Sequence, residues 1–556
     1  MKKKNVVDAI NRIKGIDYPY LKKIFIYPFI QLSILFVIAV FLKEMGFLPS
    51  YLLDFILFGL LLPLFALPIL MDFNEQSYDI RIKPFYLYIG IIIIFIFAIV
   101  VRLIPYSTNS IPLGYDPGYY KYAMDTYLSA LPGIPEATLP LWMKQMHEQG
   151  FFVLFDELHL FTGIGSMKAV IYLLPFFSAL LILPIFILTR KIFDENAALI
   201  ACALYAVSYT QFTAFTFMYL RNILGIFFLL LALYALEKKN YVFIAIMFAA
   251  LGIYHRPEFL IFSLILICYF LKTRDRYLIY SSILAAFLIF PFWLPRIETV
   301  FPLISGLSNT MIQNIQAEPT GGGTFFDLGK YEWVSLVYLP FSIIGAFYMI
   351  SKKMWNSLFF YFAINGVIIA FRLFFYNRLL IDFDIALLIL ASAGITCTFL
   401  ARHKISRVTG TAFIILLLFS GGTATLRNAH DIKPLMNEDQ IKAIEWIANN
   451  TDENAYILAT SYDAPWVLAW GKRKILAPGL FEWDGNGKEK WLEFIGTGNS
   501  TVAQEFLKKY NNDVYIYYSF NKFNRMNLEK FNNTAFTKNL MKDSVIYHYV
   551  NDDDGS

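Results

Sequence analysis

Long apolar runs separated by short polar breaks constrain this chain more than any other feature of its sequence. About thirteen such runs recur through the first 424 residues, and most are roughly 17–23 residues long. About 20 apolar residues in a helix cross the ~30 Å hydrocarbon core of a bilayer. The composition fits, because 58% of the 556 residues are hydrophobic and only 16% are charged. We therefore expect a polytopic α-helical membrane protein with about thirteen transmembrane helices.

The expected spans cover residues 24–42, 51–71, 84–104, 168–189, 196–214, 218–236, 241–254, 257–271, 277–295, 333–351, 355–374, 378–400 and 408–424. The seventh and eighth are short, so each could be tilted or re-entrant. The first is too long for the apolar part of a signal peptide and lacks an Ala-x-Ala-like exit, which predicts an uncleaved anchor.

Basic residues fall in alternate loops, and this regularity predicts the orientation of the chain, since cytoplasmic loops accumulate Lys and Arg. With the lysine-rich N-terminus in the cytoplasm, the loops on that side contain Arg81 and Lys83, Arg190 and Lys191, Lys238 and Lys239, Lys272 with Arg274 and Arg276, Lys352 and Lys353, and Arg402 with Lys404 and Arg407. Segments 105–167 and 296–332 are then external loops. The net charge of +5 comes from the cytoplasmic loops and gives no indication of nucleic acid binding.

The chain is expected to divide into a multi-span membrane domain, residues 1–424, and a small extracytoplasmic α/β domain, residues 425–556. All three cysteines lie in apolar spans, so we expect no disulfide in the exported parts. The predicted helices and strands of the second domain are Glu438–Asn450, Tyr456–Thr460, Val502–Lys509 and Val514–Tyr518. The Asn-x-Ser/Thr sequons at Asn449, Asn499 and Asn532 and the small size of the external domain favour a prokaryotic, archaeal-type cell membrane.

The first external segment begins with an acidic and aromatic motif, in which Asp116 precedes a proline and is followed by Tyr119 and Tyr120. An Asp before Pro is a good helix N-cap, and tyrosines settle at headgroup level. A carboxylate held just outside a span also suits cation binding or proton acceptance from a nucleophile. Both roles are compatible with the motif.

Further along this segment, Pro140–Gly150 is predicted to form an amphipathic helix. A solvated helix face explains most of the charges there, including His147 and Glu148, and Asp156 follows further along the segment. A metal shell completed by one of these acids stays open as an alternative.

Basic residues mark the external ends of several later spans. Arg221, His255 and Arg256 could extend to the headgroups, as charged side chains at helix ends do. Alternatively they bind phosphate, for which Arg offers planar bidentate donors. Arg378 opens the twelfth span and could either neutralise Asp382, four residues later, or bind a phosphate; we favour phosphate.

The second external loop carries Glu318, three consecutive glycines at 321–323, and Asp327. Glycines give such a loop the freedom to order over a bound substrate, although a slack connector would have the same composition. The two flanking acids favour a functional loop.

Together these motifs resemble the oligosaccharyltransferase catalytic subunit family within the GT-C superfamily of membrane glycosyltransferases. Asp116 corresponds to the family's first acidic motif, Glu318 to the glutamate of its flexible external loop, and Arg378 to its donor-phosphate arginine. Asp463, within Ser461-Tyr462-Asp463-Ala464-Pro465, resembles the aspartate of its acceptor motif. The resemblance implies a divalent metal, Mn or Mg, bound by Asp116 and Glu318.

Two departures from this family stand out. Leu220-Arg221-Asn222 occupies the place of a second acidic motif, which removes metal-binding carboxylates and adds a positive charge. The Trp-Trp-Asp-Tyr-Gly acceptor signature is also absent. Both departures weaken transfer to Asn-x-Ser/Thr and favour a related glycosyltransferase with another acceptor.

We therefore expect inverting transfer of a sugar from a polyprenyl (dolichyl) phosphate-linked donor to a protein, lipid or glycan acceptor at the external membrane face. Asp116 and Glu318 would be catalytic, and Arg378, Arg256, His255 and Arg221 would bind the donor. The alternatives are an oligosaccharyltransferase acting on Asn-x-Ser/Thr, a lipid or glycan transporter, and a non-catalytic relative with the same fold.

Overall fold

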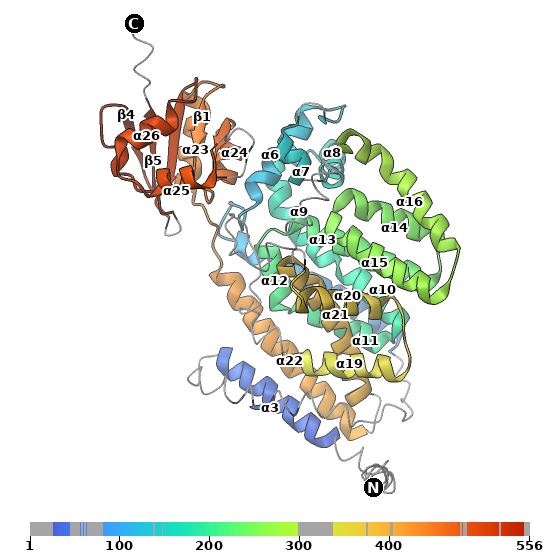
Figure 1. The fold of residues 1–556 in the computed structure, drawn as a ribbon. Helices are drawn as coiled ribbons and strands as arrows, with labels where there is room; N and C mark the ends of the chain where they lie inside the picture. Colours follow the sequence, from blue (N-terminus) through green and yellow to red (C-terminus); the bar gives the residue numbers. More distant parts are fainter. Residues whose placement is uncertain are drawn as a thin grey trace, which may run out of the picture.

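The computed structural model describes residues 26–44, 82–136, 139–146, 148–297, 337–373, 376–400, 404–478, 486–521 and 524–549, with the single positions 56, 59, 60, 63 and 481. Helices form most of these residues (Figure 1). In chain order they are α3 (Ile26–Glu44), α5 (Pro84–Leu103), α6 (Pro117–Ser129), α7 (Leu141–Met146), α8 (Gly150–Thr162), α9 (Ser166–Leu180), α10 (Ile182–Ile192), α11 (Glu195–Ala206), α12 (Tyr209–Thr216), α13 (Leu220–Lys238), α14 (Tyr241–Tyr254), α15 (Arg256–Thr273), α16 (Tyr277–Trp293), α19 (Leu339–Ser351), α20 (Ser357–Ala370), α21 (Tyr376–Ile395), α22 (Lys404–Asp431), α23 (Glu438–Asn450), α24 (Ala464–Gly471), α25 (Lys488–Gly496) and α26 (Ser500–Leu507).

Within the described ranges, six helical segments are long and apolar enough to cross a membrane: Pro84–Tyr106, Ser166–Ile192, Leu220–Lys238, Tyr277–Arg296, Tyr376–Leu400 and Val408–Asp431. A seventh results if α11 and α12, bent by 48°, count as one broken span. Shorter apolar helices cover Pro28–Leu42, Tyr241–Tyr254, Leu339–Ser351 and Ser357–Ala370. The chain is therefore a multi-pass membrane protein, and the total of about thirteen spans stays a prediction.

Helix α21 lies at the centre of the membrane part, and almost all of the span Tyr376–Leu400 is buried. Helix α19 approaches it so closely that only glycine fits at the contact. A Cβ atom on Gly345 would lie 2.0 Å from the carbonyl oxygen of Leu390, and one on Gly394 would lie 2.1 Å from that of Phe341. Small residues at such contacts let membrane helices pack through their backbones.

The break between α11 and α12 is attached to α21 by a buried carboxylate. Asp384 accepts hydrogen bonds from Ser208 Oγ at 3.0 Å and Gln211 Nε2 at 2.8 Å, and another from the Tyr338 hydroxyl. Ser208 also caps α12 by accepting from the Gln211 backbone N–H. Polar groups at a helix break need such partners where water is excluded.

The C-terminal part contains a five-stranded mixed sheet in the order β2-β1-β3-β5-β4. The strands are β1 (Tyr456–Leu458), β2 (Lys474–Leu476), β3 (Val514–Ser519), β4 (Phe536–Met541) and β5 (Ser544–Tyr549). Strand β1 runs parallel to β2 and β3, whereas β5 runs antiparallel to β3 and β4. Helix α23 has the bounds expected from the sequence, and β1 and β3 fall on the expected strands.

Alternate residues of this sheet face two different cores, as the period of a strand requires. Ile457 and Ile475 belong to the apolar core that is continuous with the membrane helices. Their neighbours Leu458 and Leu476 belong to a separate core that includes Trp491. One face of the sheet therefore packs against the rest of the molecule.

That contact is made between α24 and α6, which lie next to each other in Figure 1. A Cβ atom on Gly118 would lie 1.8 Å from the carbonyl oxygen of Pro465, so the two backbones touch. The Tyr115 hydroxyl donates a hydrogen bond to the carbonyl of Ser461, and Tyr119 packs on Phe481 with ring centroids 6.3 Å apart. The C-terminal part thus covers the beginning of α6.

Candidate active site

Asp116 stands at the N-cap position of α6, directly beneath the docked C-terminal part. Pro117 fills the first helical position, as the sequence predicts, but the Asp116 carboxylate makes no capping hydrogen bond to α6. Burial raises the pKa of this carboxyl group, while the positive charges of Arg378 and Arg221 oppose the rise. The Asp116 side chain therefore does not cap α6, and the charges of two arginines act on it.

Two arginines from distant helices flank this carboxylate. Arg221 lies in the first turn of α13, with its guanidinium 6.0 Å from the ring centroid of Tyr120. Arg378 lies in the first turn of α21, with its guanidinium 5.7 Å from the ring centroid of Tyr219, the N-cap residue of α13. Aromatic faces attract guanidinium groups and hold them in a defined orientation.

The two tyrosines predicted to bind substrate have different surroundings. Tyr120 is 2% exposed and lies under the Arg221 guanidinium. Tyr119 is part of an aromatic cluster, with ring centroids 5.7 Å from Trp142 and 6.2 Å from Tyr115. Tyr120 therefore lies at the charged site, whereas Tyr119 contributes to the interface with the C-terminal part.

Glu148 is a central residue of the site that sequence reasoning assigned to a solvated face. It is 8% exposed, and its Oε2 accepts a hydrogen bond from Arg221 Nη1 at 2.6 Å. Its Oε1 accepts from the backbone N–H of Arg256 at 3.3 Å and lies 3.4 Å from Arg256 Nε. Burial raises the pKa of Glu148, but the guanidiniums of Arg221 and Arg256 outweigh burial and hold it well below its usual range. Glu148 joins the first turns of α13 and α15.

His255 and Arg256 lie at the junction of α14 and α15. The His255 ring Nδ1 and Glu258 Oε2 share a hydrogen bond, and both residues are buried. Gly225 allows this close packing, because a Cβ atom there would lie 2.9 Å from Glu258 Oε2. The His255 side chain is thus inside the protein, which differs from the alternative that it extends to the headgroups.

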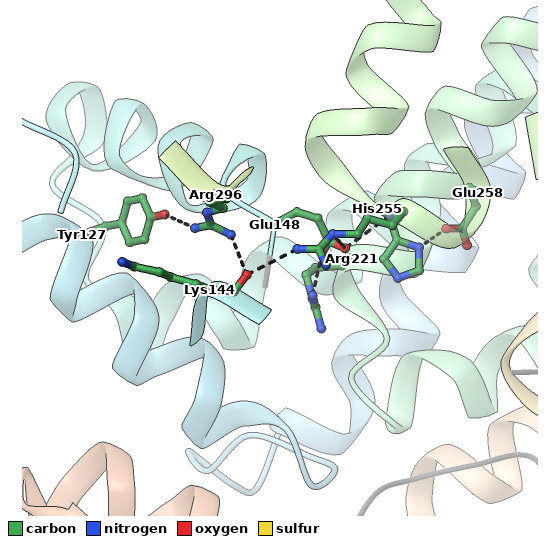
Figure 2. Close-up of polar contacts among 8 residues, drawn as sticks. Tyr127, Lys144, Glu148, Arg221, His255, Glu258 and Arg296 are labelled. Atoms are coloured by element: carbon green, nitrogen blue, oxygen red, sulfur yellow. Dashed lines mark hydrogen bonds and ion pairs between the residues drawn. The ribbon is translucent and has the colours of Figure 1, made fainter. Parts of the chain in front are cut away.

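A second ion pair, between Arg296 and Glu136, closes one end of this cluster. Figure 2 shows the bonds of Arg296 to the Tyr127 hydroxyl and to the carbonyl oxygen of Lys144. Arg296 donates to both carboxylate oxygens of Glu136, each at 2.8 Å, and to the Tyr127 hydroxyl at 3.1 Å. The carbonyl oxygen of Lys144 accepts from Arg296 at 3.5 Å and from Arg256 at 3.4 Å. These bonds attach the residues that directly follow α16 to the segment that carries α6 and α7.

Asp463 lies inside the C-terminal part and is 0% exposed. Its carboxylate accepts hydrogen bonds from Ser519 N and Oγ at 3.1 and 2.7 Å, and from Asn524 Nδ2 at 2.8 Å. Burial raises its pKa to about 6, with these hydrogen bonds opposing the rise. This geometry attaches α24 to β3 and does not present the carboxylate to an acceptor.

Three other predictions from the sequence can be compared with the described residues. Asp382 accepts a hydrogen bond from the Tyr361 hydroxyl at 3.0 Å, and not from Arg378, so these charges do not simply neutralise each other. The helix expected over 140–150 is α7, which ends at Met146. Glu318 and His147 lie outside the described residues.

The described residues do not fit a divalent cation. They contain no group of three His, Cys, Asp or Glu side chains that could hold a metal ion. The charged neighbours that act on Asp116 are two guanidiniums, and Glu148 is paired with arginines. Asp116 and Glu148 face Arg221, Arg256 and Arg378, so positive charge is in excess and an anion is the better ligand.

The sequence alone indicated Arg221, Arg256 and Arg378 as candidate site residues, because each is a charged residue at the end of an apolar span. Glu148 had no such signal, because its partners are 73 and 108 residues away along the chain.

Comparisons with known proteins agree with this architecture. Residues 157–295 match the family described as dolichyl-phosphate-mannose-protein mannosyltransferase. A comparison with curated protein sequences found no match.

Solved structures share the fold over most of the chain. The apo oligosaccharyltransferase of Archaeoglobus fulgidus is 14% identical, with a TM-score of 0.59 over 79% of this chain and 70% of that chain. The oligosaccharyltransferase AglB of Archaeoglobus fulgidus, in complex with an inhibitory peptide and a dolichol-phosphate, is 13% identical, with a TM-score of 0.58 over the same shares of the two chains. A further Archaeoglobus fulgidus oligosaccharyltransferase structure, in complex with Zn and sulfate, has a TM-score of 0.55 at 14% identity over 78% and 68% of the two chains.

The arabinofuranosyltransferase AftD from Mycobacteria is 11% identical, with a TM-score of 0.55 over 86% of this chain and 41% of that chain. By the family match over residues 157–295 and by the shared fold, the chain resembles membrane glycosyltransferases of the GT-C type.

Proposed function

We propose that this protein transfers a sugar or glycan from a polyprenyl-phosphate-linked donor to an acceptor at the external face of the membrane. The observation that carries the proposal is that Asp116, Arg221 and Arg378 lie at the beginnings of α6, α13 and α21, where the charges of the two arginines act on the Asp116 carboxylate. A carboxylate can accept the acceptor's proton, and guanidiniums stabilise a departing phosphate.

In the proposed step, a hydroxyl or amide of the acceptor attacks the anomeric carbon of the donor sugar. The bond from this carbon to the phosphate oxygen breaks, and the lipid phosphate leaves with the bonding electrons. Asp116 takes the proton from the nucleophile, and Arg378 stabilises the charge on the phosphate. The anomeric configuration is inverted, because attack and departure occur on opposite faces.

The names of the similar proteins support the chemical class of donor. The matched family is named for a dolichyl-phosphate mannose donor, and AglB was solved with a dolichol-phosphate. A protein acceptor carrying Asn-x-Ser/Thr is the runner-up, supported by the inhibitory peptide bound to AglB. Lipid or glycan acceptors remain within the proposal.

The proposal includes an orientation and a division of the chain. Residues 1–424 form the membrane domain with a cytoplasmic N-terminus, and residues 425–556 form an extracytoplasmic domain. The docking of α24 on α6 supports this, since it puts the C-terminal part on the side of Asp116. Glu318 and a divalent metal, Mn or Mg, stay predictions from the family resemblance.

The test is transfer from a radiolabelled polyprenyl-phosphate sugar in membranes that contain the protein, with separate counting of lipid, protein and soluble glycan products. An Asn-x-Thr peptide is added in a parallel arm. Asp116→Asn should abolish transfer to every acceptor. Asp125→Asn is the matched control, because Asp125 lies on the same helix in a partly exposed ion pair with Lys121. Full activity of Asp116→Asn at equal expression would refute the proposal.

A lipid or glycan transporter is a second candidate, favoured by the 48° break between α11 and α12. Broken helices are common in transporters. Movement of labelled donor across vesicles without consumption of its sugar would support this candidate instead.

A further inference from the structure

The N-terminus of α13 gathers hydrogen-bond donors from three places in the sequence. Tyr219 stands at its N-cap and makes no side-chain capping bond, and Arg221 and Asn222 follow in the first turn. Arg378 approaches the same helix end from α21, over the ring of Tyr219. The first backbone N–H groups of a helix and its dipole already favour an anion at this position.

Asn222 gives independent evidence for a ligand at this helix end. Asn222 is only 4% exposed, and its side-chain amide Nδ2 has no hydrogen-bond partner among the described residues. A buried amide donor without an acceptor destabilises the folded protein. A phosphate oxygen at the start of α13 would supply that acceptor.

Glu148 holds Arg221 in position for such a ligand. The 2.6 Å ion pair and the contact with the Tyr120 ring restrict the guanidinium from two sides. Glu148 also binds Arg256, so one carboxylate orients two arginines without cancelling both of their charges. The fold therefore keeps more positive charges from arginines at this site than negative charges from Asp116 and Glu148.

We propose that Arg221, Asn222 and the N-terminus of α13, together with Arg378, form a phosphate subsite that binds the donor's lipid phosphate without a divalent cation. This inference rests on the proposed function and deepens it, because it gives Arg221 the electrostatic role that a metal ion has at other phosphate sites. Two guanidiniums and a helix end of about half a positive charge match the charge of a phosphate.

The experiment measures the binding of undecaprenyl monophosphate to the purified full-length protein in nanodiscs, once with EDTA and once with Mn²⁺. The dissociation constant should be the same in both. Arg221→Gln should raise it about 10- to 100-fold, the loss expected for a charge-assisted hydrogen bond to phosphate. Arg221→Lys, which can keep the ion pair with Glu148, should lose part of the affinity because the bidentate geometry is gone.

Arg190→Gln is the matched control, since Arg190 forms an exposed ion pair with Glu195 far from this site; its binding should equal the wild type. Inorganic phosphate as competitor separates the lipid headgroup from a free anion: strong competition at low concentration would mean that a soluble phosphate is the ligand and would overturn the lipid assignment. Thermal unfolding of each variant identifies loss of fold, and the comparison of EDTA with Mn²⁺ on the wild type needs no variant.

Binding that requires Mn²⁺ and is lost in EDTA would overturn the inference but leave the proposed function standing. Equal binding by the wild type and Arg221→Gln would also overturn it. If the wild type neither binds the lipid phosphate nor turns over any donor under either condition, both the inference and the proposed function fail.

Discussion

Glu148 is buried between two guanidiniums, so its pKa and its contribution to the stability of the fold depend on both of them. Its pKa is held well below the usual range, so the carboxylate is charged above that pKa. A carboxyl group whose folded-state pKa is depressed stabilises the fold above its unfolded pKa and loses this contribution as the pH falls. The pair thus contributes fully at neutral pH.

Replacing Glu148 by Ala should lower the free energy of unfolding by about 3–5 kcal/mol, because it leaves two arginines without their buried counter-charge. The measurement is a denaturant titration in detergent at neutral pH. Glu195→Ala is the control: its partner Arg190 is 47% exposed, so the loss should stay within about 1 kcal/mol. Equal losses for the two variants would contradict this account.

The pH dependence of transfer follows from Asp116. As a base, it must be deprotonated, so the rate should rise with pH through a pKa above that of an ordinary aspartate. Arg221 opposes the rise in pKa, and therefore residual activity in Arg221→Gln should have its acidic limb at higher pH. The kcat/KM profile measures this, with Arg190→Gln as control. A limb that moves to lower pH would be inconsistent with Asp116 as the base.

At the scale of elements, the contact between α6 and α24 couples the C-terminal part to the site. Asp116 begins α6, and two residues later Gly118 touches the backbone of Pro465. On the other side, Asp463 begins α24 and attaches it to β3 through Ser519. A shift of either helix would therefore move the neighbourhood of Asp116.

Gly118→Ala should disturb this contact, because the new Cβ would lie 1.8 Å from the Pro465 carbonyl oxygen and neither backbone can give way cheaply. We expect faster proteolysis in the connection between α22 and α23 and at least a tenfold lower transfer rate. Gly165→Ala is the control, since nothing lies within 4 Å of a Cβ there. Unchanged proteolysis and activity would show that the contact is not needed.

At the scale of the whole molecule, the sequence predicts orientation from loop charge alone. Lys191, at the end of α10, should be cytoplasmic, and Lys490, on α25, should be external. In a variant without native cysteines, Lys490→Cys should react with a membrane-impermeant maleimide in intact cells. Lys191→Cys should react only after permeabilisation. The reverse pattern would invert the proposed topology.

Much of the fold could be predicted from local sequence patterns. The apolar runs gave the range 218–236 for a helix that runs over Leu220–Lys238, and helical periodicity gave the bounds of α23. The predicted resemblance to GT-C membrane glycosyltransferases is confirmed by the family match and the shared fold. These features depend on residues close together in the chain.

The parts that could not be predicted depend on distant residues. Glu148 pairs with Arg221 and Arg256, and no pattern near Glu148 indicates burial between them. Asp463 was expected to meet an acceptor because its local motif resembles one, but its partners come from β3 and Asn524. A single sequence does not specify such tertiary contacts.

The order of the charged residues along the chain bears on how this membrane protein is assembled during synthesis. Glu148 leaves the ribosome before Arg221, and Arg256 follows last. Moving an arginine to the external side opposes the bias that retains positive charge in the cytoplasm. In the proposed orientation, each arriving arginine meets an acidic partner that has already been translocated. Loss of Glu148 should therefore impair insertion of α13 itself, before any finished protein exists to be destabilised.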